Sequence, residues 1–192
     1  MKWKQMTPST CLNRWGRYLS MKKPLPATII NDLRAGDQTA FFLVYEQYKS
    51  LLYFVIMSIV KHKEDAEDLL QDTFIKIMQN IDTLDQISRF KSWAAMIARN
   101  LSLNHLKAKK NLVFLDEDVF ELIKTDDTYF PFLQDFQDHL SQVENLVIAY
   151  KIVYEFTFDE ISDLLHTPRS TVYKTYQEAL AKLRKTYRGK EK

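Results

Sequence analysis

The side chains best suited to a chemical task lie near the C-terminus, from about Phe158 to Leu183. Thr157 and Glu160 have the spacing of a capping box, in which each side chain accepts a hydrogen bond from a free backbone N–H at a helix start. Thr167 and Pro168 then predict a second start, an N-cap followed by proline at the first helical position. A helix, a tight turn and a helix with exposed polar donors are typical of proteins that contact base edges in DNA. The predicted donors and their neighbours are Arg169, Ser170, Tyr173, Lys174 and Gln177.

The distribution of charge favours a nucleic-acid partner. The net charge is only +2, but residues 91–110 carry five bases and no acid (+5), residues 111–140 carry eight acids and one base (−7), and residues 166–192 carry eight bases and two acids (+6). Bases beyond the second helix supply the attraction to phosphates on which DNA affinity depends. Spacing alone leaves an alternative open, a surface helical hairpin with a solvated cationic face.

Scarce residue types exclude several classes of protein. No glycine lies between Gly36 and Gly189, which excludes glycine-rich phosphate loops and nucleophile elbows. With Cys11 as the one cysteine and four scattered histidines, we expect no disulfide, no metal, no cofactor and a cytoplasmic location. The most apolar segment, residues 51–60, is too short to span a bilayer.

The same scarcity of glycine and proline predicts an all-α fold. An apolar segment at residues 29–33 ends at Gly36, and Asp37 is the expected N-cap of a long helix that continues to about Val60. Further helices are expected at about 64–80, 90–109 and 140–154. The core face of the helix at 64–80 should hold Leu70, Phe74, Ile77 and Ile81, and that of the helix at 90–109 should hold Trp93, Ile97, Leu101 and Leu106.

These elements predict two small helical domains joined by an acidic linker. Residues 1–24 are expected to be a disordered or mis-started leader, 25–110 the first domain, 111–138 the linker and 139–192 the helix-turn-helix domain. The linker holds many apolar side chains, so part of it should dock or form short helices.

From Ile29 to Arg184 the sequence resembles the bacterial extracytoplasmic-function (ECF) sigma factors of the sigma-70 family. One set of motifs is similar to the σ2 domain: residues 65–74 (DAEDLLQDTF), 90–93 (FKSW), 97–101 (IARNL) and His105-Leu106. The other is similar to the σ4 domain: residues 158–161 (FDEI), 167–172 (TPRSTV) and Leu183-Arg184. The order and spacing of the two sets make the combined signal specific.

The resemblance implies a role for each set of matching residues. Binding to the clamp helices of core RNA polymerase is implied for Asp68, Gln71, Asp72 and Ile75. Capture of the opened minus-ten strand is implied for Asp85, Gln86, Ile87, Ser88, Arg89, Lys91, Trp93, Asn100, Asn104 and Lys107, although Trp93 alone is more typical of a core residue. Recognition of the minus-thirty-five duplex is implied for Arg169, Ser170, Thr171, Tyr173, Lys174 and Gln177.

The sequence departs from the family pattern at four positions. Glu155 and His166 stand where relatives often have glycine, and His tolerates a left-handed backbone better than most residues, so we expect the turn to be intact. Glu178 and Leu180 occupy positions that are often basic, which predicts fewer phosphate contacts along the second helix.

The resemblance implies a transcription initiation factor without enzymatic activity, a monomer when free. Its implied partners are core RNA polymerase (clamp helices and flap), promoter DNA and a candidate anti-sigma factor, with no membrane insertion. Two alternatives stay open: a polymerase-independent helix-turn-helix regulator, and a nucleic-acid-processing enzyme that holds Mg²⁺ on the carboxylates between Glu64 and Asp72.

Overall fold

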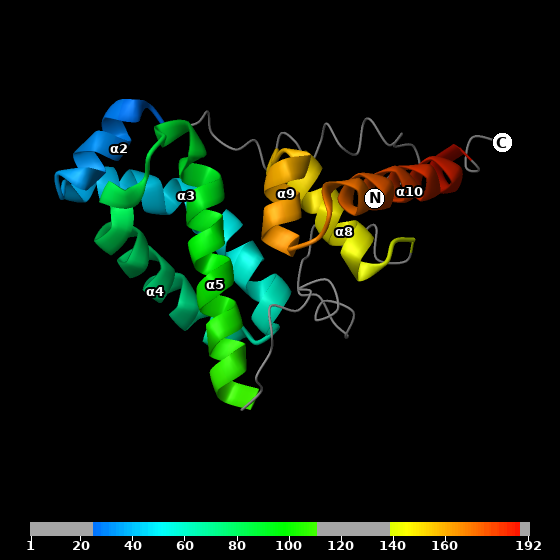
Figure 1. Ribbon diagram of the computed structural model, residues 1–192, viewed down its shortest axis with the longest axis horizontal. Coiled ribbons are helices and arrows are strands. Elements are labelled where there is room, and N and C mark those ends of the chain that lie inside the picture. Colours follow the sequence, from blue (N-terminus) through cyan, green and yellow to red (C-terminus); the bar gives the residue numbers. More distant parts are fainter. Residues whose placement is uncertain (1–24, 111–138, 189–192) are drawn as a thin grey trace, which may run out of the picture. The chain divides into compact units, whose positions relative to one another are not determined.

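The computed structural model describes residues 25–110 and 139–188, apart from the side chains of residues 110, 187 and 188 (Figure 1). Every regular element in these ranges is helical, which confirms the predicted all-α fold of two small helical domains. The domain boundaries stay predictions, and the predicted leader and acidic linker lie outside the described residues. None of the described helices is long and apolar enough to cross a membrane.

Residues 25–110, the described part of the first unit, form four α-helices. The two longest, α3 and α5, contact each other, and α4 contacts both (Figure 1). Two 3-10 turns, Ile81–Thr83 and Ile87–Arg89, join α4 to α5. The α-helices are α2 (Ala27–Arg34), α3 (Gln38–Val60), α4 (Lys63–Asn80) and α5 (Phe90–Lys110).

Local chemistry sets where these helices begin and end. Asp37 caps α3 as predicted, because its carboxylate accepts a hydrogen bond from the backbone N–H of Ala40 at 2.7 Å. Gly36, just before it, has a φ of 82°, which glycine adopts at no steric cost. Lys61 ends α3 in the left-handed conformation with a φ of 56°. The predicted helices at residues 37–60, 64–80 and 90–109 are therefore present to within a residue at each end.

The core faces of α4 and α5 differ from the prediction. In α4 Phe74, Ile77 and the following Ile81 are buried as expected, but Leu69 is buried and Leu70 is only half-buried. In α5 the predicted residues Trp93, Ile97 and Leu101 are half-buried, and Leu106 is buried as expected. The innermost row of α5 consists of Ala94, Ala95, Ala98 and Ser102.

Close packing explains the shift in α5. This helix crosses both α3 and α4, and small side chains at a helix crossing let the backbones approach while larger ones flank the contact. Ser102 is accommodated inside because its hydroxyl donates a hydrogen bond to the carbonyl of Ala98 at 2.8 Å. Ranking positions by apolar size therefore misplaces the centre of the contact by about one residue.

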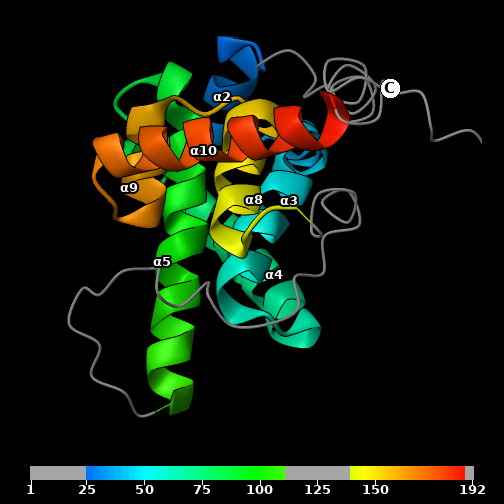
Figure 2. The ribbon, with the colours of Figure 1, turned by 90° about the vertical axis from the view of Figure 1, so that its right-hand side faces the viewer.

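The described part of the second unit, residues 139–188, contains three α-helices and one π-helical turn. They are α8 (Gln142–Ile148), the π-helix η3 (Ala149–Val153), α9 (Phe158–Leu165) and α10 (Arg169–Arg188). The predicted helix at 140–154 thus starts at residue 142, capped by Ser141, and changes to π geometry after residue 148. Figure 2 shows α10 as the longest helix of this unit, and it contacts both α8 and α9.

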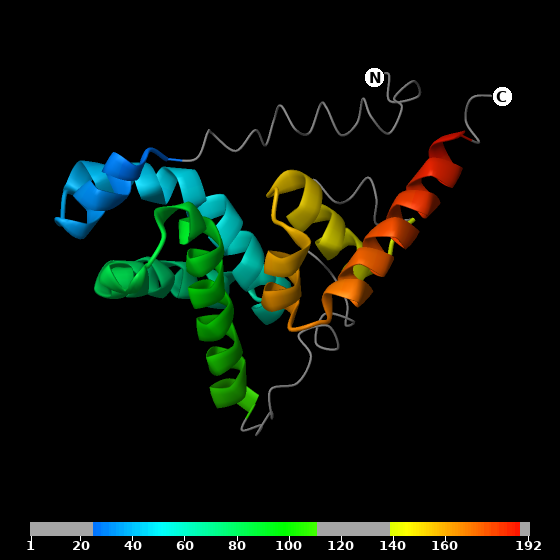
Figure 3. The ribbon, with the colours of Figure 1, turned by 45° about the horizontal axis from the view of Figure 1, so that its top comes forward.

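A short turn joins α9 to α10 (Figure 3). The predicted capping box at Thr157 and Glu160 is present, and His166 is left-handed with a φ of 51°, so the turn is intact as expected. The start of α10 is one residue later than predicted. Thr167 is not its N-cap, because the Thr167 hydroxyl donates to the carbonyl of Leu165, and the Pro168 carbonyl accepts the first helical hydrogen bonds.

Candidate nucleic-acid interface

The start of α10 presents a polar face. Val172, Ala179 and Leu183 are buried, and this fixes which side of the helix points outward. All six side chains predicted to contact the minus-thirty-five element are exposed: Arg169, Ser170, Thr171, Tyr173, Lys174 and Gln177.

An aromatic cluster supports this face. The ring of Phe158, at the start of α9, lies 5.3 Å from that of Tyr173 and 5.4 Å from that of Tyr176, both edge-on. The ammonium of Lys151 lies 4.7 Å from the Phe158 ring centroid and donates a hydrogen bond to the carbonyl of Phe156 at 3.0 Å. Tyr173 is half exposed, so one of its edges is fixed by Phe158 while the rest of the ring stays available.

Both cations at the start of α10, Arg169 and Lys174, lie beside acids. The Nε atom of Arg169 is 3.0 Å from a carboxylate oxygen of Asp159, across the turn. The ammonium of Lys174 is 3.9 Å from a carboxylate oxygen of Glu178, one helical turn further on. All four side chains are more than half exposed, so these are solvated ion pairs.

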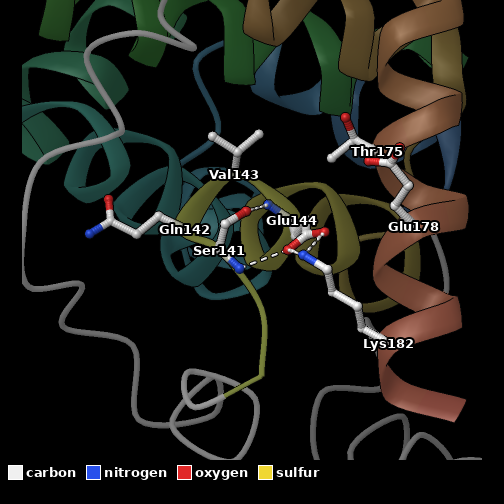
Figure 4. Close-up of a pocket in the computed structure, with 7 residues that line it drawn as sticks. All are labelled: Ser141, Gln142, Val143, Glu144, Thr175, Glu178 and Lys182. Carbon is white, nitrogen blue, oxygen red and sulfur yellow. Dashed lines mark hydrogen bonds and ion pairs between the residues drawn. The ribbon is translucent and has the colours of Figure 1, made fainter. Parts of the chain in front are cut away.

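A third ion pair, formed by Lys182 one helical turn beyond Glu178, is partly buried. The ammonium of Lys182 lies 2.7 Å from a carboxylate oxygen of Glu144, at a hollow of about 340 Å³ between α8 and α10 (Figure 4). Burial works to raise the pKa of Glu144, but hydrogen bonds from Lys182 and Ser141 outweigh it, so the pKa lies below its ordinary value. The same carboxylate completes the capping box of α8, because it accepts a hydrogen bond from the Ser141 backbone at 2.8 Å.

The outer face of α4 is acidic with one apolar side chain. Ile75 leaves 55% of its surface exposed, an uncommon position for a large aliphatic residue. It lies among polar neighbours one helical turn away on the same face. The four side chains predicted to bind polymerase are all exposed: Asp68, Gln71, Asp72 and Ile75.

The segment before α5 is held at its start by an arginine. Arg34 of α2 donates hydrogen bonds to the carbonyls of Ile81 and Leu84, and Leu84 is buried. Of the five residues that follow, only Ile87 is half-buried, and the other four are exposed: Asp85, Gln86, Ser88 and Arg89.

On α5, the predicted minus-ten residues divide by burial. Asn100 and Asn104 are exposed, whereas Lys91, Trp93 and Lys107 are half-buried. The Trp93 ring lies 5.9 Å from the buried ring of Phe90, so it is neither a core residue nor a fully exposed one.

One cluster in this unit was not predicted. The Asp65 carboxylate lies 2.7 Å from the ammonium of Lys109 and 3.3 Å from Nε2 of His105, which connects the start of α4 to the end of α5. Hydrogen bonding to Lys109 holds the pKa of Asp65 below its ordinary value, with a smaller contribution from His105. Among the described residues, no three histidines, cysteines or carboxylates lie close enough to hold a metal ion.

Comparison with known proteins finds a family match in the first unit. The family model of sigma-70 region 2 matches residues 44–111, which include α4, α5 and the turns between them. The ECF RNA polymerase sigma factor SigW of Bacillus subtilis (strain 168) is 33% identical over 90 residues, 47% of this chain and 48% of SigW. The chain contains a sigma-70 region 2. SigM of the same strain, also an ECF RNA polymerase sigma factor, is 33% identical over 76 residues, 40% of this chain and 46% of SigM.

Two solved structures share the fold of this chain. A structure of CnrH in complex with the cytosolic domain of CnrY has a TM-score of 0.51 at 19% identity, over 81% of this chain and 92% of that one. The sigma factor RpoE of Bartonella quintana, in complex with the anti-sigma factor NepR, has a TM-score of 0.52 at 21% identity, over 76% and 94% of the two chains. The chain spans about half the length of SigW.

The predicted surfaces differ in how they stand to the region 2 match. The acidic face of α4 and the segment before α5 lie inside the matched range of the sigma-70 family model, and α10 lies beyond it. Phe158 and Asp159 were missed as neighbours of the α10 face, because they come from another helix. Both residues lie at the first positions of α9, and only three residues separate α9 from α10. That short turn is the sequence signal that predicts contact between the two helices.

Proposed function

We propose that this chain is a sigma factor: it binds core RNA polymerase and directs transcription to specific promoters, without chemistry of its own. The observation that carries the proposal is the sigma-70 region 2 match over residues 44–111, whose outer α4 face is exposed and presents Ile75 among acids.

Within this proposal the first domain, residues 25–110, binds polymerase and holds the opened minus-ten strand. Asn100, Asn104 and Lys107 supply hydrogen-bond donors and charge along one helix, and the partly exposed ring of Trp93 is available for stacking on a base. The basic segment 91–110 neutralises the backbone of the strand.

The second domain, residues 139–192, contacts the duplex of the minus-thirty-five element through α10. Its exposed start offers donors of four kinds: a guanidinium, an ammonium, an amide and hydroxyls. The two domains act together, because fixing both on one polymerase raises the effective concentration of each for its own half of the promoter. In this proposal the chain is a cytoplasmic monomer when free. The complex of RpoE with the anti-sigma factor NepR supports an anti-sigma factor as a further partner.

Promoter-dependent transcription with core polymerase tests the proposal. Adding the protein to core should give a stable complex and run-off transcripts from genomic templates. If neither forms, the proposal fails; a protein that shifts promoter duplex alone, without any complex with core, would instead be a polymerase-independent regulator.

Two variants separate the proposed surfaces. Asp72→Arg reverses the charge of the α4 face and should abolish binding to core, whereas the matched Asp82→Arg, on an exposed acid outside that face, should not. Lys174→Ala should leave core binding intact and weaken only promoter recognition. Equal loss of core binding in both arginine variants would refute the assigned face.

A further inference from the structure

The segment formed by α9, the turn and the first half of α10 is unusually acidic for a DNA-reading surface. Residues 157–178 contain four acids and two bases, a net charge of −2. The acids are Asp159, Glu160, Asp163 and Glu178, and the bases are Arg169 and Lys174. Since non-specific DNA affinity comes almost entirely from phosphate neutralisation, this face should bind DNA weakly by itself.

The geometry shows how two of these acids act. Asp159 lies 3.0 Å from the Nε atom of Arg169, and Glu178 lies 3.9 Å from the ammonium of Lys174. Glu160 differs, because its carboxylate accepts a hydrogen bond from the Thr157 backbone at 2.8 Å and completes the capping box. Asp163 is exposed, and the structure gives it no ion pair within the described residues.

We propose that Asp159 and Glu178 mask the two cations at the start of α10, Arg169 and Lys174, so that these two add to DNA affinity only when the domain is tethered beside its promoter element. The inference rests on the proposed function and adds residues that set its strength. In the free protein each phosphate competes with an acid already paired to the cation. After displacement that acid stays beside the phosphate and repels it.

The expected size of the effect follows from counterion release. Each cation that neutralises a phosphate adds about 0.9 to the slope of log affinity against log salt. If the contacts contribute nothing at about 1 M salt, each is worth roughly 8-fold in affinity at about 0.1 M, and two are worth roughly 60-fold. Tethering at a millimolar effective concentration offsets a loss of this size, whereas a free domain has no such compensation.

The double variant Asp159→Asn with Glu178→Gln tests the masking. Its binding to a short duplex of mixed sequence is measured by fluorescence anisotropy on the full chain without polymerase, between about 50 and 200 mM salt. The matched control is Asp163→Asn with Asp82→Asn, which changes the net charge by the same amount but releases neither cation. Circular dichroism confirms that each variant is folded.

The masked cations should account for the whole gain. We expect the double variant to bind up to about 60-fold more tightly than wild type at about 0.1 M salt, with a slope steeper by about 1.8, and the control to change little. Adding Arg169→Ala and Lys174→Ala to the double variant should remove the gain.

Masking is refuted if the control gains as much as the double variant, if the slope is unchanged, or if the gain survives the two alanines. If promoter-dependent transcription is intact in the same preparations, such results refute masking and leave the proposed function standing. If no variant binds duplex at the lowest salt, masking and the DNA-reading role of α10 fail together, and binding to core polymerase is still measured separately.

Discussion

Removing either partner of the Glu144–Lys182 ion pair should destabilise the second unit, but by different amounts. The Glu144 side chain is only 6% exposed, whereas that of Lys182 is 52% exposed. Lys182→Met keeps the aliphatic stem and leaves a buried carboxylate without its counter-charge, which should cost about 3 kcal/mol. Glu144→Gln leaves an ammonium that water can solvate and an amide oxygen that still accepts from Ser141, so the cost should be about 1 kcal/mol.

The difference should also depend on pH. The pKa of Glu144 lies below its ordinary value in the folded protein, so its contribution to stability is fully present above the unfolded pKa and is lost as pH falls through the folded pKa. In Lys182→Met the burial remains and the ammonium is gone, so the pKa of Glu144 should rise. The carboxyl then protonates at a higher pH than in wild type, and the penalty of the variant should shrink on acidification.

Hydrogen exchange followed by mass spectrometry on the full chain measures both effects locally. Peptides from α8 and α10 should lose protection in Lys182→Met at neutral pH, less so near about pH 4, after correction for intrinsic exchange rates. Lys185→Met, an exposed position on the same helix, is the control. The reasoning is refuted if Glu144→Gln loses more protection than Lys182→Met, or if the control matches it.

Two further substitutions have defined outcomes. His166→Val places a β-branched residue in a left-handed turn with a φ of 51° and should destabilise the second unit by roughly 1–2 kcal/mol, whereas His166→Gly should not; thermal melts of the two should therefore diverge, and equal melts would contradict the strained turn. Ala98→Leu adds volume to a side chain with 0% exposure at the α5 contact and should cost about 1–3 kcal/mol in chemical denaturation, while Ala108→Leu at an exposed position of the same helix should be nearly neutral.

Features that depend on a few neighbouring residues were predictable from the sequence. The cap at Asp37, the capping box at Thr157 and the left-handed His166 each follow from the chemistry of one turn of chain, and all three are present. One error of this kind, the start of α10, arises because the Thr167 hydroxyl donates a hydrogen bond back to the Leu165 carbonyl instead of capping the following helix.

Features that depend on packing between helices were predicted less well. The row of small residues in α5 is buried because two other helices cross it, and nothing in the α5 sequence itself states where they cross. The pairs Asp159–Arg169, Glu144–Lys182 and Asp65–Lys109 join residues on different helices, so charge counts along the chain show their acids and bases without showing which acid faces which base.

The small-residue row of α5 separates two kinds of constraint on this helix. Ala94, Ala98 and Ser102 fix its place in the fold, while Asn100 and Asn104 point away from them into solvent. Mutations in the outer row therefore meet little resistance from folding and are free to accumulate under selection for a new target. Such a helix can change what it recognises by single substitutions, because the protein stays folded after each one.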